Sequence, residues 1–203
     1  YFIPNQLIQH TESALHVPWG NWHSVDHSIY GFFIESFNDE LAHLQNEDPI
    51  EYRASLLADQ PRFLKVLNKA AEKSSWHQPL PEKWGRGITI HQSFGTIVAE
   101  VVIVQIIEGK INVERVVCVA DAGFAMHRDA FIAQMESGII YGLTAALYGE
   151  ITIKNGAVEQ HNFHDHKMLR IDETPIIETY VINSHEKIGG AGEPSTPVIA
   201  PAL

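Results

Sequence analysis

The sequence predicts an α+β protein that is helical first and sheet-rich later. Between residues 31 and 74, apolar side chains recur every three to four positions, which is the period of amphipathic helices. Between residues 88 and 120 they form near-continuous β-branched runs, which are typical of buried strands. The stretch 77–87 between these regions holds two prolines and two glycines. We therefore divide the chain there, into a helical segment 1–84 and a sheet-rich portion 85–203.

Three helices are expected in the first part, over about 31–46, 49–58 and 61–74. Asp48 is a candidate N-cap for the second of them, because Pro49 then takes the first helical position. We expect the apolar side of the first helix to face the core and its polar side to face solvent. The apolar side consists of Phe33, Phe37, Leu41 and Leu44, and the polar side of Glu35, Asp39, Glu40 and Gln45.

The second part is expected to combine strands with one long helix, from about 128 to 147. Gly138 and Gly142 lie inside that helix, where each costs about 1 kcal/mol relative to alanine. We infer that something approaches this face of the helix closely. The last fifteen residues are rich in glycine and proline and are expected to form a loop. The expected strands are 88–107 and 111–120, joined as a hairpin, then 149–154, 157–162 and 175–183.

Composition excludes several classes of function. The net charge is 14 − 25 = −11, which argues against binding to nucleic acid or to an anionic membrane surface. No apolar run reaches the roughly 18–20 residues of a transmembrane helix. The single cysteine, Cys118, excludes an internal disulfide and a multi-cysteine zinc or iron–sulfur site made by this chain alone. Because no signal peptide is visible at Tyr1 and the chain stops after a proline-rich run, we interpret it as a piece of something longer, of unknown compartment.

The most unusual segment is Gly189-Gly-Ala-Gly-Glu-Pro194, in which one carboxylate is surrounded by glycines and a proline. Glycines let a ligand approach the main chain, and proline restricts the backbone of the residue before it. Held in a pocket, Glu193 would be a candidate general base. The alternative is a flexible turn with an exposed glutamate.

Two further groups are weaker candidates. His161, His164 and His166 could hold a metal ion, or could form a polar strand end or loop. Gln134 could offer its amide to a polar ligand, or could simply lie on the surface of its helix.

Taken together and in this order, these segments resemble the C-terminal part of the molybdopterin-binding large (beta) subunit of molybdenum hydroxylases. This is the xanthine oxidase/aldehyde oxidoreductase family, and the likeness is to its isoquinoline 1-oxidoreductase branch. It runs from about residue 17 to residue 203. The segments that carry it are Val17-Pro-Trp-Gly-Asn-Trp-His-Ser-Val25, Glu35-Ser-Phe-Asn-Asp-Glu-Leu-Ala42, Gly85-Arg-Gly-Ile88, Ser93-Phe-Gly95, Arg115-Val-Val-Cys-Val-Ala-Asp-Ala-Gly123, Ala133-Gln-Met-Glu-Ser-Gly138, Tyr141-Gly-Leu-Thr-Ala-Ala-Leu147, Gln160-His-Asn-Phe-His-Asp165, Gly189-Gly-Ala-Gly-Glu-Pro194 and Ala200-Pro-Ala202.

The resemblance implies a role for several residues. Glu193 would be the general base at the molybdenum centre, in the oxidation of an N-heteroaromatic or aldehyde carbon with water-derived oxygen. Gln134 would bind the pterin, close to glycines such as Gly138 that let the cofactor approach. Gly190 and Gly192 would also contact the cofactor, and no residue of this chain would ligate the metal. The histidine cluster would be a structural strand.

The resemblance also implies an oxidoreductase of bacterial type, of which this chain is a fragment that is inactive alone. The cofactor would be molybdopterin in its cytosine dinucleotide form with molybdenum, bound only by the full-length enzyme. Its partners would be the remainder of the large subunit, a small 2Fe–2S subunit and a small aromatic or aldehyde substrate, with no membrane span. His23, Asp26 and Ser137 depart from the family pattern. Two alternatives therefore stay open: a non-catalytic scaffold that has lost the cofactor, and a histidine-ligated metal protein.

Overall fold

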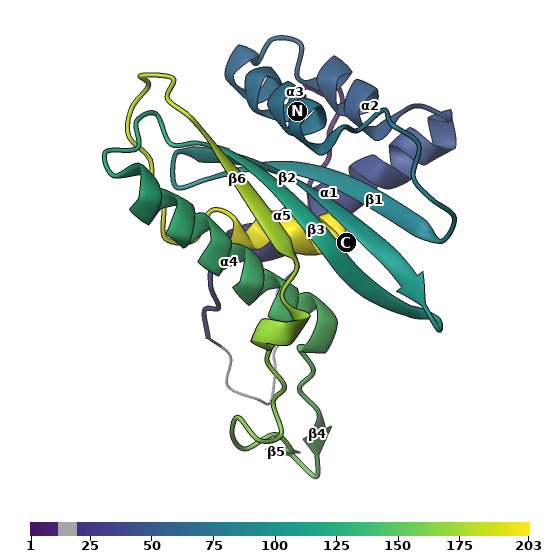
Figure 1. Cartoon of the computed structure of the whole chain (residues 1–203). Coiled ribbons are helices and arrows are strands. Elements are labelled where there is room, and N and C mark those ends of the chain that lie inside the picture. The colour runs from purple at the N-terminus through teal and green to yellow at the C-terminus, as the bar shows by residue number, and fades with distance from the viewer. Residues whose placement is uncertain (12–19) are drawn as a thin grey trace.

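The computed structural model describes residues 1–11 and 20–203. Residues 17–19, which begin the first segment of the family resemblance, lie outside the described residues. The chain is α+β, as expected: a mixed four-stranded sheet with helices on both faces (Figure 1). The sheet order is β1-β2-β3-β6, in which β6 runs parallel to β3 and the other neighbours are antiparallel. The elements are α1 (Asp26–Gln45), α2 (Pro49–Leu56), α3 (Pro61–Ser74), β1 (Trp84–Ser93), β2 (Thr96–Ile107), β3 (Lys110–Asp121), α4 (Arg128–Tyr148), β4 (Ile153–Lys154), β5 (Ala157–Val158), η1 (Ile171–Glu173), β6 (Ile176–Ile182) and α5 (Thr196–Ala202).

The expected strand 88–107 is in fact two strands, because a tight turn separates β1 from β2. Phe94 and Gly95 form this turn with φ values of 52° and 81°. Positive φ at both central residues is the mark of a type I′ hairpin, whose twist matches that of the flanking strands. The signal is weak in the sequence, because phenylalanine rarely adopts this conformation. The glycine-rich loop near the end of the chain packs on this turn.

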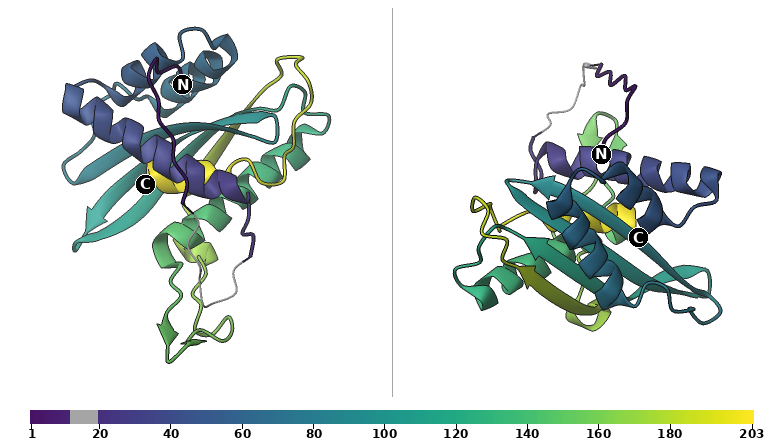
Figure 2. Two further views of the ribbon diagram at one scale, coloured as in Figure 1. Left: turned by 180° about the vertical axis from the view of Figure 1, so that it is seen from behind. Right: turned by 90° about the horizontal axis from the view of Figure 1, so that it is seen from above.

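The sheet separates two apolar clusters. Val98 and Val102 of β2 face the cluster formed with α4 and α5, whereas Ala99 and Val101 face the cluster formed with α2 and α3. This alternation follows from the two-residue period of a strand. Figure 2 shows the resulting layers from behind and from above. Residues from both sides of the boundary at 84/85 share the second cluster.

The end of the chain corrects one expectation, since residues 196–202 form helix α5 and not a loop. Pro197 lies in the first turn of this helix, where its missing N–H costs nothing. The prolines of this segment led to the prediction of a loop, because proline usually interrupts a helix. Helix α5 packs between α1, α4 and the sheet.

A second expectation was wrong for helix α1, because most of its expected apolar side is exposed and Glu35 of its expected polar side is buried. Its buried residues are Gly31, Glu35, Asn38 and Ala42. Phe33, Phe37 and Leu44, which were expected in the core, are 63%, 57% and 79% exposed.

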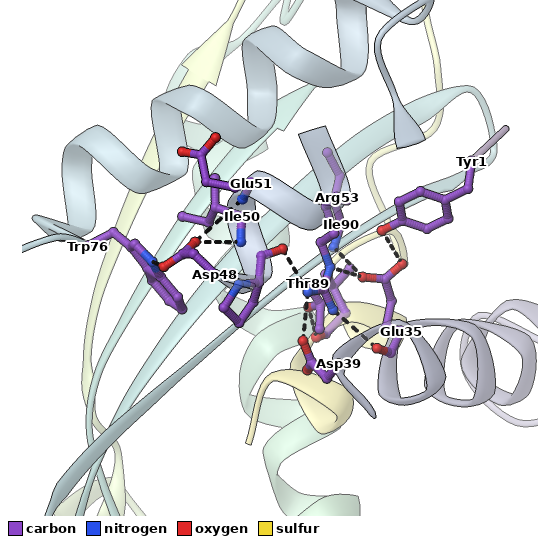
Figure 3. A network of polar contacts seen from close by, with 12 residues as sticks. Tyr1, Glu35, Asp39, Asp48, Ile50, Glu51, Arg53, Trp76, Thr89 and Ile90 are labelled. Atoms are coloured by element: carbon purple, nitrogen blue, oxygen red, sulfur yellow. Dashed lines mark hydrogen bonds and ion pairs between the residues drawn. The ribbon is translucent and has the colours of Figure 1, made fainter. Parts of the chain in front are cut away.

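A buried polar network explains this orientation (Figure 3). The Arg53 guanidinium donates from Nε to Glu35 Oε2 at 2.9 Å and from Nη1 to Asp39 Oδ1 at 2.6 Å. Tyr1 donates its hydroxyl to Glu35 Oε1 at 2.6 Å, and the Ile90 N–H donates to Glu35 Oε2 at 3.1 Å. Hydrogen-bonded in this way, a glutamate can occupy the inner side of the helix.

Helix α4 has the length and apolar composition of a membrane-spanning segment, and it is the one helix of the described residues that does. The expectation that no apolar run comes near the length of a transmembrane helix was therefore wrong for α4, as judged by length and composition alone. Core helices of soluble proteins share these properties, and α4 buries Phe131, Met135, Ile139 and Leu143 in the apolar cluster against the sheet and α5.

The segment after α4 is more irregular than expected. Strands expected at 149–154 and 157–162 shrink to the two-residue strands β4 and β5, joined by the Asn155-Gly156 turn. The hairpin extends away from the sheet (Figure 1).

Candidate active site

The glycine-rich loop 189–194 is held against the β1–β2 turn. The Gly190 N–H donates to the Phe94 carbonyl at 2.8 Å, and Thr96 Oγ1 donates to the Gly190 carbonyl at 2.5 Å. A Cβ on Gly189 would lie 2.4 Å from Thr96 Oγ1 and 2.6 Å from the Gly95 carbonyl carbon, so only glycine fits there. The start of the loop, at Gly189 and Gly190, is therefore held in place by the β1–β2 turn.

Glu193 leaves this loop with a fixed backbone and a partly exposed side chain. Its carbonyl accepts hydrogen bonds from the Thr196 N–H at 3.1 Å and from Ser24 Oγ at 3.3 Å. Its carboxylate lies 3.2 Å from His23, between Oε1 and Nδ1, with 36% of the side chain exposed. Pro194 and Ser195 behind it are buried. The backbone of Glu193 is thus held in place while its carboxylate stays partly exposed, as a general base requires.

The segment before α1 forms the second wall of the site. Trp22 and His23 pack on Tyr141 of α4, with ring centroids 5.2 Å and 4.7 Å apart. Ser24 and Val25 follow with φ values of 68° and 46°, a conformation that is strained for a β-branched residue. Such strain persists where the surrounding structure holds it, and functional sites are common places for it. Here it directs His23 and Ser24 toward Glu193.

The other expected site residues fall into two groups. Gln134 is exposed on α4, and Tyr141 lies two helical turns further along the same side. The Gln134 amide and the Tyr141 ring therefore share one face of α4. Gly190 and Gly192 are exposed, and a Cβ on Gly192 would meet no atom within 4 Å. Gly192 therefore has room for a ligand, whereas a Cβ on Gly190 would lie 3.1 Å from Phe94 Cβ.

Gly138 does not have that room. It is buried, and a Cβ there would come within 2.1 Å of Ser195 Oγ. Gly142 is closed in the same way by Ile199 Cγ2 at 2.3 Å. The close approach expected at this pair exists, but helix α5 makes it. The interpretation that this pair admits the cofactor is therefore replaced by helix packing.

A histidine pair lies behind the site, where α1 meets β1. His27 Nδ1 is 3.1 Å from His91 Nε2, and the His27 ring packs on Phe94 at 5.2 Å between centroids. Burial, with the neighbouring His27, lowers the pKa of His91 to about 4. This imidazole is therefore neutral at neutral pH.

Sequence reasoning found Glu193 but missed His23, Ser24 and Tyr141 as its surroundings. His23 stood out only as a departure from a family pattern. Nothing local in the sequence joins it to a residue 170 positions later, because that contact depends on how α1 and α5 pack.

The histidine cluster is a loop, which corrects the strand implied for it. Asp165 accepts the His161 and Asn162 N–H groups at 2.9 Å and 2.8 Å and so shapes the turn. The His161 and His164 side chains are 74% and 77% exposed. Over residues 1–11 and 20–203, no group of three His, Cys, Asp or Glu side chains is arranged to hold a metal ion.

The polar groups at this site are the Glu193 carboxylate, the His23 imidazole and the exposed backbone of Gly190 and Gly192, and the Gln134 amide is exposed on α4. These groups suit a polar organic cofactor. In a comparison with protein families, residues 50–175 match the molybdopterin cofactor-binding domain. The chain belongs to this family. The match confirms the resemblance drawn from the sequence; it includes Gln134 and Gly138 and ends before Glu193.

Relatives with curated functions extend the likeness of this molybdopterin-binding chain. It is 32% identical over 178 residues to the isoquinoline 1-oxidoreductase subunit beta of Brevundimonas diminuta, covering 85% of this chain and 23% of that protein. It is 29% identical over 191 residues to a membrane-bound aldehyde dehydrogenase (pyrroloquinoline-quinone) of Gluconacetobacter polyoxogenes, covering 84% and 25%. The chain thus spans about a quarter of the length of these relatives. Among solved structures, quinoline 2-oxidoreductase from Pseudomonas putida 86 has a TM-score of 0.48 and 17% identity, over 52% of this chain and 14% of that one.

Proposed function

We propose that this chain is part of the catalytic subunit of a molybdenum hydroxylase, with Glu193 as its general base. The observation that carries the proposal is Glu193: its backbone carbonyl is held by Ser24 and Thr196, and its partly exposed carboxylate lies 3.2 Å from His23. The family match and the relatives' names, an isoquinoline oxidoreductase and an aldehyde dehydrogenase, support an oxidoreductase acting on an N-heteroaromatic or aldehyde carbon.

Each residue of the site has a stated task in this proposal. Gln134 and the backbone at Gly190 and Gly192 would hold molybdopterin, in the cytosine dinucleotide form. When bound, the cofactor supplies the two-electron acceptor and activates the water-derived oxygen. Glu193 takes the proton of that oxygen on its carboxylate, and His23 at 3.2 Å fixes the orientation of the carboxylate.

The remaining parts of the enzyme would come from elsewhere. A small 2Fe–2S subunit would accept the electrons, because this chain's single cysteine cannot hold a cluster. The remainder of the large subunit would complete the pocket, and the isolated chain is expected to be inactive. The relatives' much greater length supports this division.

The test is Glu193→Gln in the intact enzyme. Because the amide keeps the side-chain shape but cannot accept a proton, we expect hydroxylation to fall by about 10²–10⁴-fold while molybdenum stays bound. Glu186→Gln, an exposed glutamate of the loop before the glycines, is the control and should retain activity. Wild-type turnover in the Glu193 variant would remove this residue from the mechanism.

A second candidate is a scaffold that kept the fold and lost the cofactor. The closure of Gly138 by Ser195 favours it, together with the departures at His23 and Ser137. The absence of molybdenum from the intact, folded protein would decide for the scaffold.

A further inference from the structure

The outer face of α1, which we define as Ile29, Tyr30, Phe33, Ile34, Phe37 and Leu44, is apolar, and within the described part of the chain nothing covers it. These side chains are between 42% and 79% exposed. Figure 2 shows α1 crossing the outside of the molecule, with α5 beneath it. At 100° per residue they cluster on the side opposite to the buried Gly31, Glu35 and Asn38. Contiguous exposed apolar surface of this kind marks an interaction site.

The orientation of the helix is fixed, so this face cannot turn inward. Arg53, itself fully buried, pairs with Glu35 from the inner side, and turning the helix would carry Glu35 away and leave the buried Arg53 guanidinium without this partner. Gly31 sits against Pro197 of α5, where an added Cβ would lie 3.3 Å from its Cβ and carbonyl oxygen. Rotation of α1 therefore cannot bury its outer face in the core of this chain.

The face is continuous with the candidate active site. Trp22 and Val25, immediately before α1, are 42% and 38% exposed, and Trp22 packs on Tyr141 beside His23. A surface that covers α1 would therefore extend to the edge of the candidate active site around Glu193.

We propose that the outer face of α1 is the docking surface for the remainder of the same large subunit, which presents an apolar surface to it and closes the pocket beside Trp22. This rests on the proposed function. The length of the relatives selects this occupant: about three quarters of each lies outside the region that this chain matches, and that polypeptide is covalently available. Covering six large apolar side chains also suits a permanent contact better than a transient one.

The test uses the intact large subunit carrying the photoreactive residue p-benzoylphenylalanine in place of Phe33. The substitution keeps an aromatic ring at an exposed position, so the fold is retained. After irradiation, we expect peptide mapping to find a cross-link within the same polypeptide, outside residues 1–203. The same photoreactive residue at Asn68, exposed on α3, is the control and should give no such cross-link.

Other results would overturn the proposal. A cross-link to a second copy, to the small subunit or to residues 1–21 would assign the face to that occupant, and the absence of any cross-link would leave it uncovered. A second variant, Phe37→Asp, should lower the Tm of the intact subunit by several degrees, whereas Asn68→Asp should not. An unchanged Tm for Phe37→Asp would also contradict docking. None of these readouts depends on molybdenum, so the proposed function can fail while docking stands, and the reverse.

Discussion

The Glu193 carboxylate has the His23 imidazole beside it, with Nδ1 at 3.2 Å from Oε1. Ser24 and Thr196 hold the backbone, but only His23, among the side chains described, is placed to orient the carboxylate. We expect His23→Ala to lower kcat of the intact enzyme by about tenfold or more with molybdenum content unchanged, because a freely rotating carboxylate loses its alignment. His23→Asn keeps a donor near the position of Nδ1 and should restore much of the activity. Equal activity in the alanine variant and the wild type would show that the contact has no positioning role.

Glu100, on β2, poses a different problem at the residue scale. Its side chain is fully buried, and neither carboxylate oxygen has a hydrogen-bond partner in the described structure. Burial raises the pKa of this carboxyl well above its ordinary value. The folded protein then holds a proton that the unfolded chain releases, so this residue's contribution to stability falls as pH rises above about 4.5, by up to about 1.4 kcal/mol per pH unit.

Glu100→Gln removes that titration. Relative to wild type, we expect the free energy of unfolding of the variant to increase from pH 5 to pH 8, as measured by urea denaturation. Parallel pH profiles for the two proteins would mean that Glu100 titrates normally.

At the scale of elements, the contact between α4 and α5 depends on absent side chains. A Cβ on Gly142 would lie 2.3 Å from Ile199 Cγ2 and 2.9 Å from the Thr196 carbonyl oxygen. We expect Gly142→Ala to destabilise by about 1–3 kcal/mol, because this overpacking exceeds the gain in helix propensity. Ser137→Ala, exposed on the same helix, gains propensity without a clash and should not destabilise. Thermal unfolding distinguishes the two, and a Gly142 variant more stable than wild type would contradict this packing.

Local patterns predicted the elements better than their surroundings. The helix over 61–74 is found at its expected bounds, because its apolar period, its first-turn proline and its packing partners all agree. Helix α1 was predicted as a helix with the wrong face inward, since apolar periodicity cannot tell a buried face from an exposed apolar one. The reversal depends on Arg53, which lies in another element.

The candidate site shows the same limit. The glycines around Glu193 are local and identify the loop, whereas His23 and Tyr141 come from distant segments and needed the tertiary structure. Gly138 was correctly read as a point of close approach, but the sequence does not say that the approaching group is Ser195, immediately before α5.

At the scale of the whole molecule, the sheet with its two apolar clusters holds together a site that is open on one side. Segments 22–25, α4 and the glycine loop meet at Glu193, and the apolar face of α1 extends from the same edge. With a quarter of the length of its relatives, the chain supplies one wall of a larger pocket in this account.

The most direct measurement of that claim is the molybdenum and pterin content of the purified intact protein that contains this chain. Elemental analysis should find molybdenum, and pterin fluorescence should appear in the same preparation. A folded intact protein with neither molybdenum nor pterin would contradict the account and leave the fold as a scaffold.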